Sequence, residues 1–264
     1  MYYPRPLVEI VRHVLSTGLR RVELTPQDWT ECGVELLEQV PSLRGLEVGS
    51  IHFPHILGSY VINPYPVARQ TAKLLFQRLT ELASRVGATT LVVHPPPNPK
   101  GHNRLFYETS VENLRLFGDL AAKLGVRVAV ENSPGSVGRT AEGLLQFVAE
   151  VAHPAVVPML DPTETIEAGQ DPYQFAARLA GIHHLHLSDA TSLEKHLPLG
   201  DGEVDWPRLL SALAPPPSGE VNCVVELHWK YLLPDAEAPV TRSLSVLQAA
   251  IRRVVEGRPE WRQT

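Results

Sequence analysis

The chain alternates short runs of β-branched and aliphatic residues with longer segments in which apolar residues recur every three or four positions. Most of the short runs lack a strict apolar–polar alternation, which is typical of parallel strands covered on both faces. Seven such strands are predicted, at residues 21–24, 46–52, 90–94, 126–131, 155–161, 182–187 and 221–227. An eighth would have to come from residues 1–3, which form a very short segment.

The longer segments predict helices at residues 67–86, 110–124, 140–151, 172–179, 206–213 and 240–255. Several end near a glycine, such as Gly87 and Gly125, as helices commonly do. Strands that alternate with helices predict right-handed βαβ units and a parallel sheet. Because 264 residues match the size of one α/β barrel, we predict a single domain over residues 1–264. Its expected fold is a (β/α)8 TIM barrel with a short or missing first strand.

Composition narrows the functional classes. Apolar residues make up 44% of the chain, enough for a sizeable core, and the net charge of −5 gives no basic field for strong non-specific binding of nucleic acid. The two cysteines form no CxxC pair, which disfavours a thiolate zinc site. No apolar run is long enough to span a membrane, and the first residues lack a signal-peptide pattern. We therefore expect a cytoplasmic protein.

Strand after strand ends in a potential metal ligand. Successive members of this series are about one βα unit apart: His52, His94, Glu131, Asp161, His186 and Glu226. In a barrel the carboxyl ends of the strands converge on one face, where active sites lie. Charged groups beside a core are costly unless they are paired or bound to metal. Histidine and carboxylate together suit Zn²⁺ or Mn²⁺, so the pattern predicts a metal centre.

Each residue of this series also has an ordinary structural interpretation. Glu131 could cap the turn that contains Asn132, and Asp161 could start a turn at Pro162. Side chains alternate along a strand, so His184 and His186 should share one face. The joint pattern at successive strand ends nevertheless favours a shared site over independent structural roles.

Seven segments, in order, resemble those of the xylose isomerase-like barrel superfamily, which holds sugar isomerases and epimerases together with endonuclease IV. They extend from about Arg21 to the C-terminus and read IHFPH, LVVHP, VAVENSPG, MLDPTETIEAGQD, HLHLSDA, HLPLGDGEVDW and VVELH. The resemblance implies a metal tetrad at the positions Glu131, Asp161, His186 and Glu226.

In the endonuclease IV branch the resemblance implies a larger centre with two or three Zn²⁺ or Mn²⁺ ions. Its further ligands would be His52, His94, Glu194 and His196. One position that is histidine in that branch is Glu164 here. His55 competes with His52 for the first position, because IHFPH offers two imidazoles after one strand. We favour His52.

This chain departs from both branches. Ketose epimerases usually carry an arginine shortly after the strand histidine and a second glutamate after the strand glutamate. The corresponding stretches here read SDATS and NSPGSV. The long basic loops of the DNA-repair branch are also missing, although SYVIN places Tyr60 where that branch has a tyrosine that penetrates DNA.

Three functions follow from these residues. The first is endonuclease IV-like hydrolysis of a phosphate ester, such as abasic DNA, by water activated on two or three ions. The second is isomerisation or epimerisation of a small sugar or sugar phosphate, with Glu131 and Glu226 as the acid–base pair. The third is a non-catalytic metal- or sugar-binding barrel. The extra ligands favour hydrolysis, whereas the acidic net charge favours a small substrate. We rank hydrolysis first, sugar isomerisation second and the non-catalytic barrel last. Predicted substrate contacts are His55, Tyr60, Asn132, His184 and Trp229.

Overall fold

The computed structural model describes residues 7–26, 43, 45–98, 104–214, 220–232 and 237–257. The chain forms two compact units, one comprising Arg20–Pro158 and the other comprising Met1–Leu19 with Met159–Thr264. The first predicted strand, at residues 1–3, lies outside the described residues. The single domain over residues 1–264 remains a prediction of the sequence.

The unit Arg20–Pro158 contains a five-stranded parallel sheet in the order β1-β2-β3-β4-β5. Its strands are β1 (Arg21–Leu24), β2 (Glu47–His52), β3 (Thr90–Val93), β4 (Arg127–Val130) and β5 (Val156–Pro158). Its helices are η2 (His55–Leu57), α3 (Gly58–Ile62), α4 (Pro66–Val86), α5 (Arg104–Ala122), η4 (Val137–Arg139) and α6 (Ala141–Val151).

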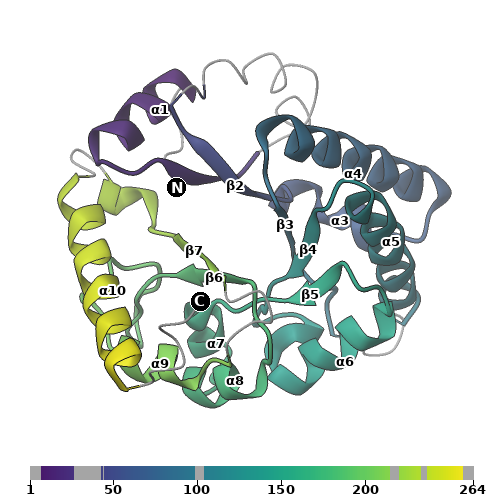
Figure 1. Ribbon diagram of the computed structural model, residues 1–264. Coiled ribbons are helices and arrows are strands. Elements are labelled where there is room, and N and C mark those ends of the chain that lie inside the picture. Colours follow the sequence, from purple (N-terminus) through teal and green to yellow (C-terminus); the bar gives the residue numbers. More distant parts are fainter. Residues whose placement is uncertain are drawn as a thin grey trace. The chain divides into compact units, whose positions relative to one another are not determined.

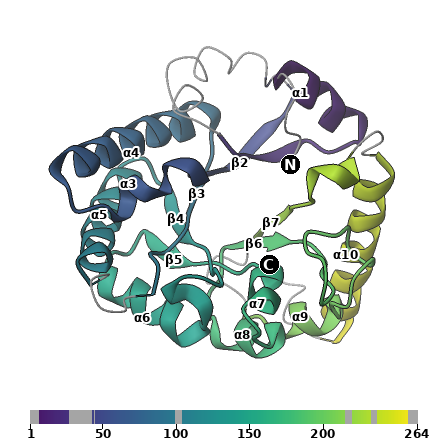
Figure 2. The same ribbon diagram turned by 180° about the vertical axis from the view of Figure 1, so that it is seen from behind.

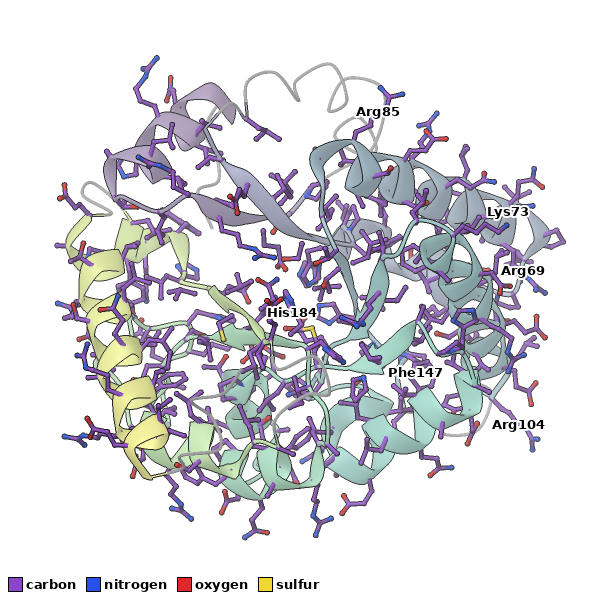
Figure 3. The ribbon with its side chains drawn as sticks, in the orientation of Figure 1. Arg69, Lys73, Arg85, Arg104, Phe147 and His184 are labelled. Carbon is purple, nitrogen blue, oxygen red and sulfur yellow. The ribbon has the colours of Figure 1, made fainter. Side chains whose placement is uncertain are left out.

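Helices α4, α5 and α6 cover this sheet in chain order, α4 against β2 and β3, α5 against β4 and β5, and α6 against β5 (Figures 1 and 2). Their apolar stripes face the strands, and Phe76 of α4 stacks on Phe117 of α5 with ring centroids 3.8 Å apart. Phe147 of α6 is buried, whereas Lys73 and Arg104 point outward (Figure 3). This packing covers the outer face of the sheet, so its polar strand ends lie at an edge.

The register of the sheet aligns three of these strand ends. His52 of β2 pairs with Val92 of β3, and Val93 pairs with Val130 of β4. His52 is the last residue of β2, while His94 and Glu131 directly follow β3 and β4. Parallel pairing in this register brings the three residues to the same edge.

The unit formed by Met1–Leu19 and Met159–Thr264 contains a parallel pair of strands, β6 (His184–Leu187) and β7 (Asn222–Val225). Leu160 forms a parallel bridge with Leu185, so a third segment continues this pair. The helices of the unit are α1 (Leu7–Ser16), α7 (Pro162–Glu167), α8 (Pro172–Arg178), α9 (Trp206–Ala212), η5 (Trp229–Leu232) and α10 (Glu237–Gly257). Helices α8, α9 and α10 pack against one another in chain order.

The seven strands form where the apolar runs predict them. The first has the predicted bounds, and the other six are shorter. The fifth is reduced to Val156–Pro158. Helix α5 begins at Arg104, six residues before its predicted start, and its first turn includes an apolar side chain that is not buried, Leu105, which is 55% exposed. An ion pair from Arg104 Nε to Glu108 Oε1, at 2.9 Å, closes that turn on the surface. Helix α7 is not predicted by apolar periodicity. Its start is set instead by the cap of the buried Asp161 carboxylate, which leaves no mark on the apolar pattern. No helix among the described residues is long and apolar enough to cross a membrane.

Candidate metal centre

The edge of the five-stranded sheet gathers two imidazoles around one carboxylate. Glu131 Oε2 lies 3.2 Å from His52 Nε2 and 3.1 Å from His94 Nε2. Glu131 and His52 are buried, and the side chain of His94 is 31% exposed. A buried carboxylate needs compensating positive charge or hydrogen bonds, and both ring nitrogens face it. These residues from three strands therefore form one polar group, as the sequence predicts.

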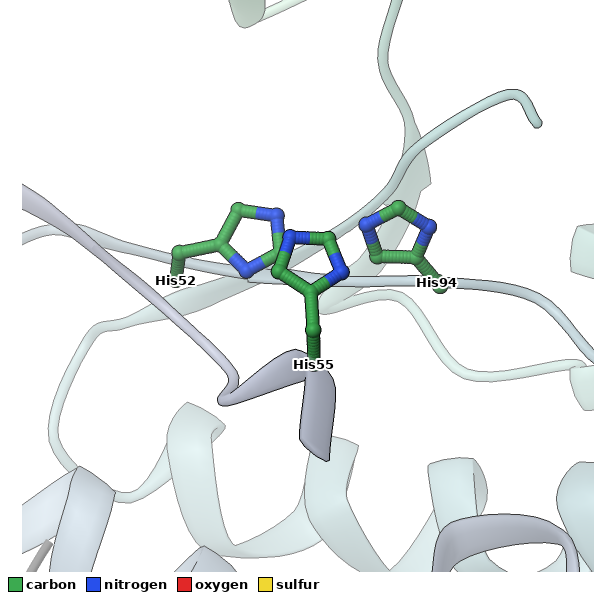
Figure 4. A group of neighbouring side chains, drawn as sticks. All are labelled: His52, His55 and His94. Carbon is green, nitrogen blue, oxygen red and sulfur yellow. The ribbon is translucent and has the colours of Figure 1, made fainter. Parts of the chain in front are cut away.

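His55 lies beside this group. It begins η2, three residues after His52, and its ring stacks on the His52 ring with centroids 4.6 Å apart. Its centroid is 4.5 Å from that of His94. The structure thus brings both imidazoles of IHFPH to the same place (Figure 4).

The unit that contains β6 and β7 gathers a second group, Asp161, His186 and Glu226. Each offers a possible ligand atom within 4.8 Å of the others, and His186 Nδ1 lies 3.0 Å from Glu226 Oε2. Asp161 and His186 are buried, whereas the Glu226 side chain is 22% exposed. Two carboxylates and one imidazole make a donor set that fits a divalent cation such as Mn²⁺ or Mg²⁺. Three of the four predicted tetrad positions converge within this unit.

Asp161 also fixes the local backbone. Its Oδ1 accepts hydrogen bonds from the amide of Thr163 at 2.7 Å, the hydroxyl of Thr163 at 2.6 Å and the amide of Glu164 at 3.2 Å. It is the N-cap of α7, with Pro162 in the first turn. The capping bonds all engage Oδ1, so Oδ2 is the oxygen better placed to bind a cation.

Glu164, a predicted ligand, faces a lysine. Lys195 Nζ donates to Glu164 Oε1 at 2.7 Å and also to Glu167, while His196 Nε2 lies 3.9 Å from the same Glu164 oxygen. Burial favours the neutral amine, but the hydrogen bonds to the two carboxylates raise the pKa of Lys195. An ion at Glu164 would therefore have to compete with a firmly protonated ammonium. Its role as a ligand stays a prediction.

Glu194 is in a similar position. It pairs with Lys230 near the surface, and hydrogen bonds from Lys230 and Tyr231 lower the pKa of Glu194. The carboxylate is thus charged and already neutralised by a local cation. Its predicted role as a metal ligand is also untested.

A series of hydrogen bonds through Thr163 and Ser188 links Asp161 to His196, and the sequence did not predict it. Thr163 Oγ1 lies 3.3 Å from Ser188 Oγ, and Ser188 Oγ lies 3.2 Å from His196 Nδ1. His196 itself adopts a left-handed backbone with φ 55°, uncommon for a residue with a Cβ. The hydrogen bond with Ser188, which directly follows β6, orients the His196 ring toward the end of that strand. Small hydroxyl residues carry no sequence signal for such a role.

The loop between β6 and α9 is anchored on Asp189, which sequence reasoning also missed. This fully buried carboxylate accepts hydrogen bonds from three backbone amides, those of Ala190, Gly200 and Val204, and from the indole of Trp206. Four donors compensate its charge without a cation. The turn at Gly200 is thus held in place by the side chain of Asp189.

Gly202 is packed so tightly against this anchor that alanine should destabilise the protein. An added Cβ would lie 2.3 Å from Asp189 Oδ1 and 2.5 Å from the Ala190 carbonyl oxygen. We expect Gly202→Ala to lower the free energy of unfolding by about 1–3 kcal/mol, measured by urea denaturation. Gly257→Ala is the matched control, because no atom lies within 4 Å of its added Cβ. Equal stability of the two variants would contradict the packing argument.

The predicted substrate contacts occupy different environments. His184 and His186 are both buried with ring centroids 5.3 Å apart, so the predicted shared face is confirmed. His184, labelled in Figure 3, lies beside β7: its Nδ1 is 3.0 Å from Asn222 Nδ2. Asn132 is buried directly after Glu131, and Trp229 is 43% exposed. Tyr60 is half-buried in α3.

The comparison with family models decides the fold. Residues 11–250 match the model of the xylose isomerase-like TIM barrel. The chain belongs to this family. The (β/α)8 barrel that the alternation of strands and helices predicts is thereby confirmed. A search of curated proteins found no match to this chain.

Solved structures with the same fold cover nearly the whole chain. A D-tagatose 3-epimerase-like protein has 19% identity and a TM-score of 0.76, with 95% of this chain and 97% of that chain covered. An L-ribulose 3-epimerase has 16% identity and a TM-score of 0.73, with coverages of 96% and 92%. A xylose isomerase-like TIM barrel protein from Mycobacterium smegmatis in complex with magnesium has 15% identity and a TM-score of 0.68, with coverages of 96% and 92%. At these identities the likeness establishes the fold alone.

Proposed function

We propose that this chain is a divalent-metal-dependent isomerase or epimerase of a small sugar. The observation that carries the proposal is the convergence of Asp161, His186 and Glu226, each at or near the end of a strand segment. The resemblance to the family implies Glu131 as the fourth ligand of this centre. A divalent cation held by these residues would polarise the carbonyl and hydroxyl oxygens of a bound sugar.

The two glutamates would move the proton. A hydrogen on the carbon beside a sugar carbonyl is weakly acidic, and a carboxylate in van der Waals reach can remove it. One of the two carboxylates, Glu131 or Glu226, would take the proton on one face of the sugar. The other would return a proton to the opposite face for epimerisation, or to the neighbouring carbon for isomerisation. The predicted acid–base pair thus matches the reaction.

The solved structures support this proposal over phosphoester hydrolysis. They include proteins described as D-tagatose 3-epimerase-like and as L-ribulose 3-epimerase, and one related barrel is described in complex with magnesium. The missing sugar-binding groups in SDATS and NSPGSV argue for a substrate held differently from those of ketose epimerases. Endonuclease IV-like hydrolysis remains the second candidate, because His52 and His94 flank Glu131 as that resemblance implies.

Hydrogen exchange into the substrate tests the proposal directly. The Mn²⁺-loaded protein should introduce deuterium from D₂O at the carbon beside the carbonyl of at least one ketose or ketose phosphate. Proton NMR of a panel of pentoses and hexoses, with and without phosphate, would measure it. Glu131→Gln and Glu226→Gln chains should show no exchange.

A nicking assay on abasic-site DNA with the same protein preparation separates the two candidates. Cleavage of that DNA without exchange in any sugar would overturn the isomerase proposal in favour of hydrolysis. Exchange in a sugar with intact DNA would support it.

A further inference from the structure

We infer that an apolar cavity between the strand pair β6–β7 and helices α9 and α10 binds a small neutral molecule of the size of one aromatic ring. The strands and helices around the cavity all belong to the unit that contains Met159–Thr264 (Figure 1). The inference adds a binding site for an apolar molecule to the metal centre, and its test does not depend on the reaction proposed above.

The strand register separates this cavity from the carboxylate-rich group. Leu185 of β6 pairs with Cys223 of β7, and both residues line the cavity. Side chains alternate along a strand, so the neighbours of Leu185, which are His184 and His186, face the opposite side. On that opposite side His184 contacts Asn222 of β7. The cavity therefore lies on the reverse face of the two strands that carry the histidines.

Aliphatic side chains from both strands and both helices line the cavity. Leu185 and Cys223 form its strand side, Leu210 of α9 and Leu247 and Val254 of α10 form its helix side, and other aliphatic residues complete it. Among the described lining residues, the Cys223 thiol is the single side-chain group that is not a hydrocarbon. A charged or strongly polar ligand would lose its hydrogen bonds to water there without replacement. The lining thus selects a neutral, apolar ligand.

The cavity is accessible to solvent. Cys223 is an exposed residue, and Ile251 of α10, which also lines the cavity, is 43% exposed. The apolar side chains around the thiol nevertheless raise the pKa of Cys223 to about 11, because they disfavour the thiolate. A thiol that water can reach, but that ionises poorly, is expected at the wall of an open apolar recess. An apolar ligand that displaces water from this surface gains free energy.

The volume of the cavity defines the size of its ligand. It is about 180 Å³. An apolar cavity of about 150 Å³ lined by Leu, Ile and Phe is sufficient to bind benzene or xenon. Sites for drug-sized molecules are larger, at about 300–1,000 Å³. One aromatic ring or a short alkyl chain therefore fits, whereas the hydroxyl groups of a sugar would be left without partners.

Benzene binding to the full-length chain tests the inference. Benzene at about 10 mM should slow the reaction of Cys223 with N-ethylmaleimide by at least about threefold and raise the thermal midpoint, because it binds the folded state. Peptide mass spectrometry measures the labelling of Cys223 separately from that of Cys32, the other cysteine of the chain. Inositol, a polyol built on a six-membered carbon ring, is the control ligand. It should change neither the labelling rate nor the thermal midpoint.

A cavity-filling variant locates the binding site. Cys223→Phe places an aromatic ring of the protein in the cavity, so benzene should no longer raise its thermal midpoint. Leu124→Phe adds the same ring at a residue that is 46% exposed in the other unit, and it should respond to benzene as the wild type does. Cys223→Leu fills less of the cavity, and its smaller benzene response replaces the test if the phenylalanine variant does not fold.

Two results would overturn the inference. One is a wild type whose Cys223 labelling rate and thermal midpoint are both unchanged by benzene. The other is a folded Cys223→Phe or Cys223→Leu chain whose benzene response equals that of the wild type, because the ligand would then bind elsewhere. Loss of the response in Cys223→Phe, together with its retention in Leu124→Phe, would support the cavity as the site.

Discussion

Glu226→Gln and Glu131→Gln should each lower kcat for the sugar substrate by about 10²–10⁴-fold. Glutamine keeps the size of glutamate and can still accept a hydrogen bond through its carbonyl oxygen, but it cannot take up a proton at neutral pH. Glu226 is suited to proton transfer because its side chain is partly exposed and its Oε2 lies 3.0 Å from His186 Nδ1. Steady-state kinetics at saturating Mn²⁺ would measure the loss.

Two controls make this result specific. Glu112→Gln removes a surface carboxylate that pairs with Arg69 at 2.6 Å, and it should leave kcat unchanged. Metal content, measured on every variant, separates loss of the proton carrier from loss of the ion. If Glu226→Gln binds metal and turns over substrate at the wild-type rate, Glu226 is not part of the acid–base pair.

Asp161 allows metal binding and helix capping to be separated by two substitutions. Asparagine retains an oxygen that can cap α7 but carries no charge, so Asp161→Asn should lose Mn²⁺ and activity while the fold persists. Alanine removes the cap as well, leaving the amides of Thr163 and Glu164 without their acceptor. Asp161→Ala should therefore lose activity and also about 1–3 kcal/mol of stability.

Metal content, activity and urea denaturation would be measured on both variants and on the wild type treated with a chelator. Chelated wild type should be inactive and should recover when Mn²⁺ is added back. Full activity of the chelated protein, or of Asp161→Asn without bound metal, would refute a metal-dependent reaction. Equal stability of the asparagine and alanine variants would refute the capping role.

The solved structures with this fold are relevant to the choice between sugar isomerisation and phosphoester hydrolysis. Sequence reasoning ranked hydrolysis first because it counted ligands, and the histidines beside Glu131 do come together as counted. Two further ligands of that scheme, Glu164 and Glu194, instead face Lys195 and Lys230. Those two carboxylates are therefore already neutralised by local ammonium groups.

The sequence alone determined the barrel and the strand ends that carry chemistry. Continuous apolar runs identify strands covered on both faces, and a polar residue that directly follows such a run must emerge at the edge of the sheet. This reasoning placed all six residues of the series at strand ends on one face of the barrel, because it depends only on local pattern and on parallel connectivity. The six residues are His52, His94, Glu131, Asp161, His186 and Glu226. Family membership then confirmed the fold.

Only the tertiary structure decided which atoms meet. Helix α7 starts at a buried carboxylate that caps it, and a surface ion pair closes the first turn of α5; neither feature alters apolar periodicity. The burial of Asp189 under four donors depends on a loop that returns from residue 204. The choice between His52 and His55 could not be made from IHFPH, because both imidazoles follow the same strand. The turn at Pro54 brings both rings against His94, and contacts between residues distant in sequence are fixed by packing in three dimensions.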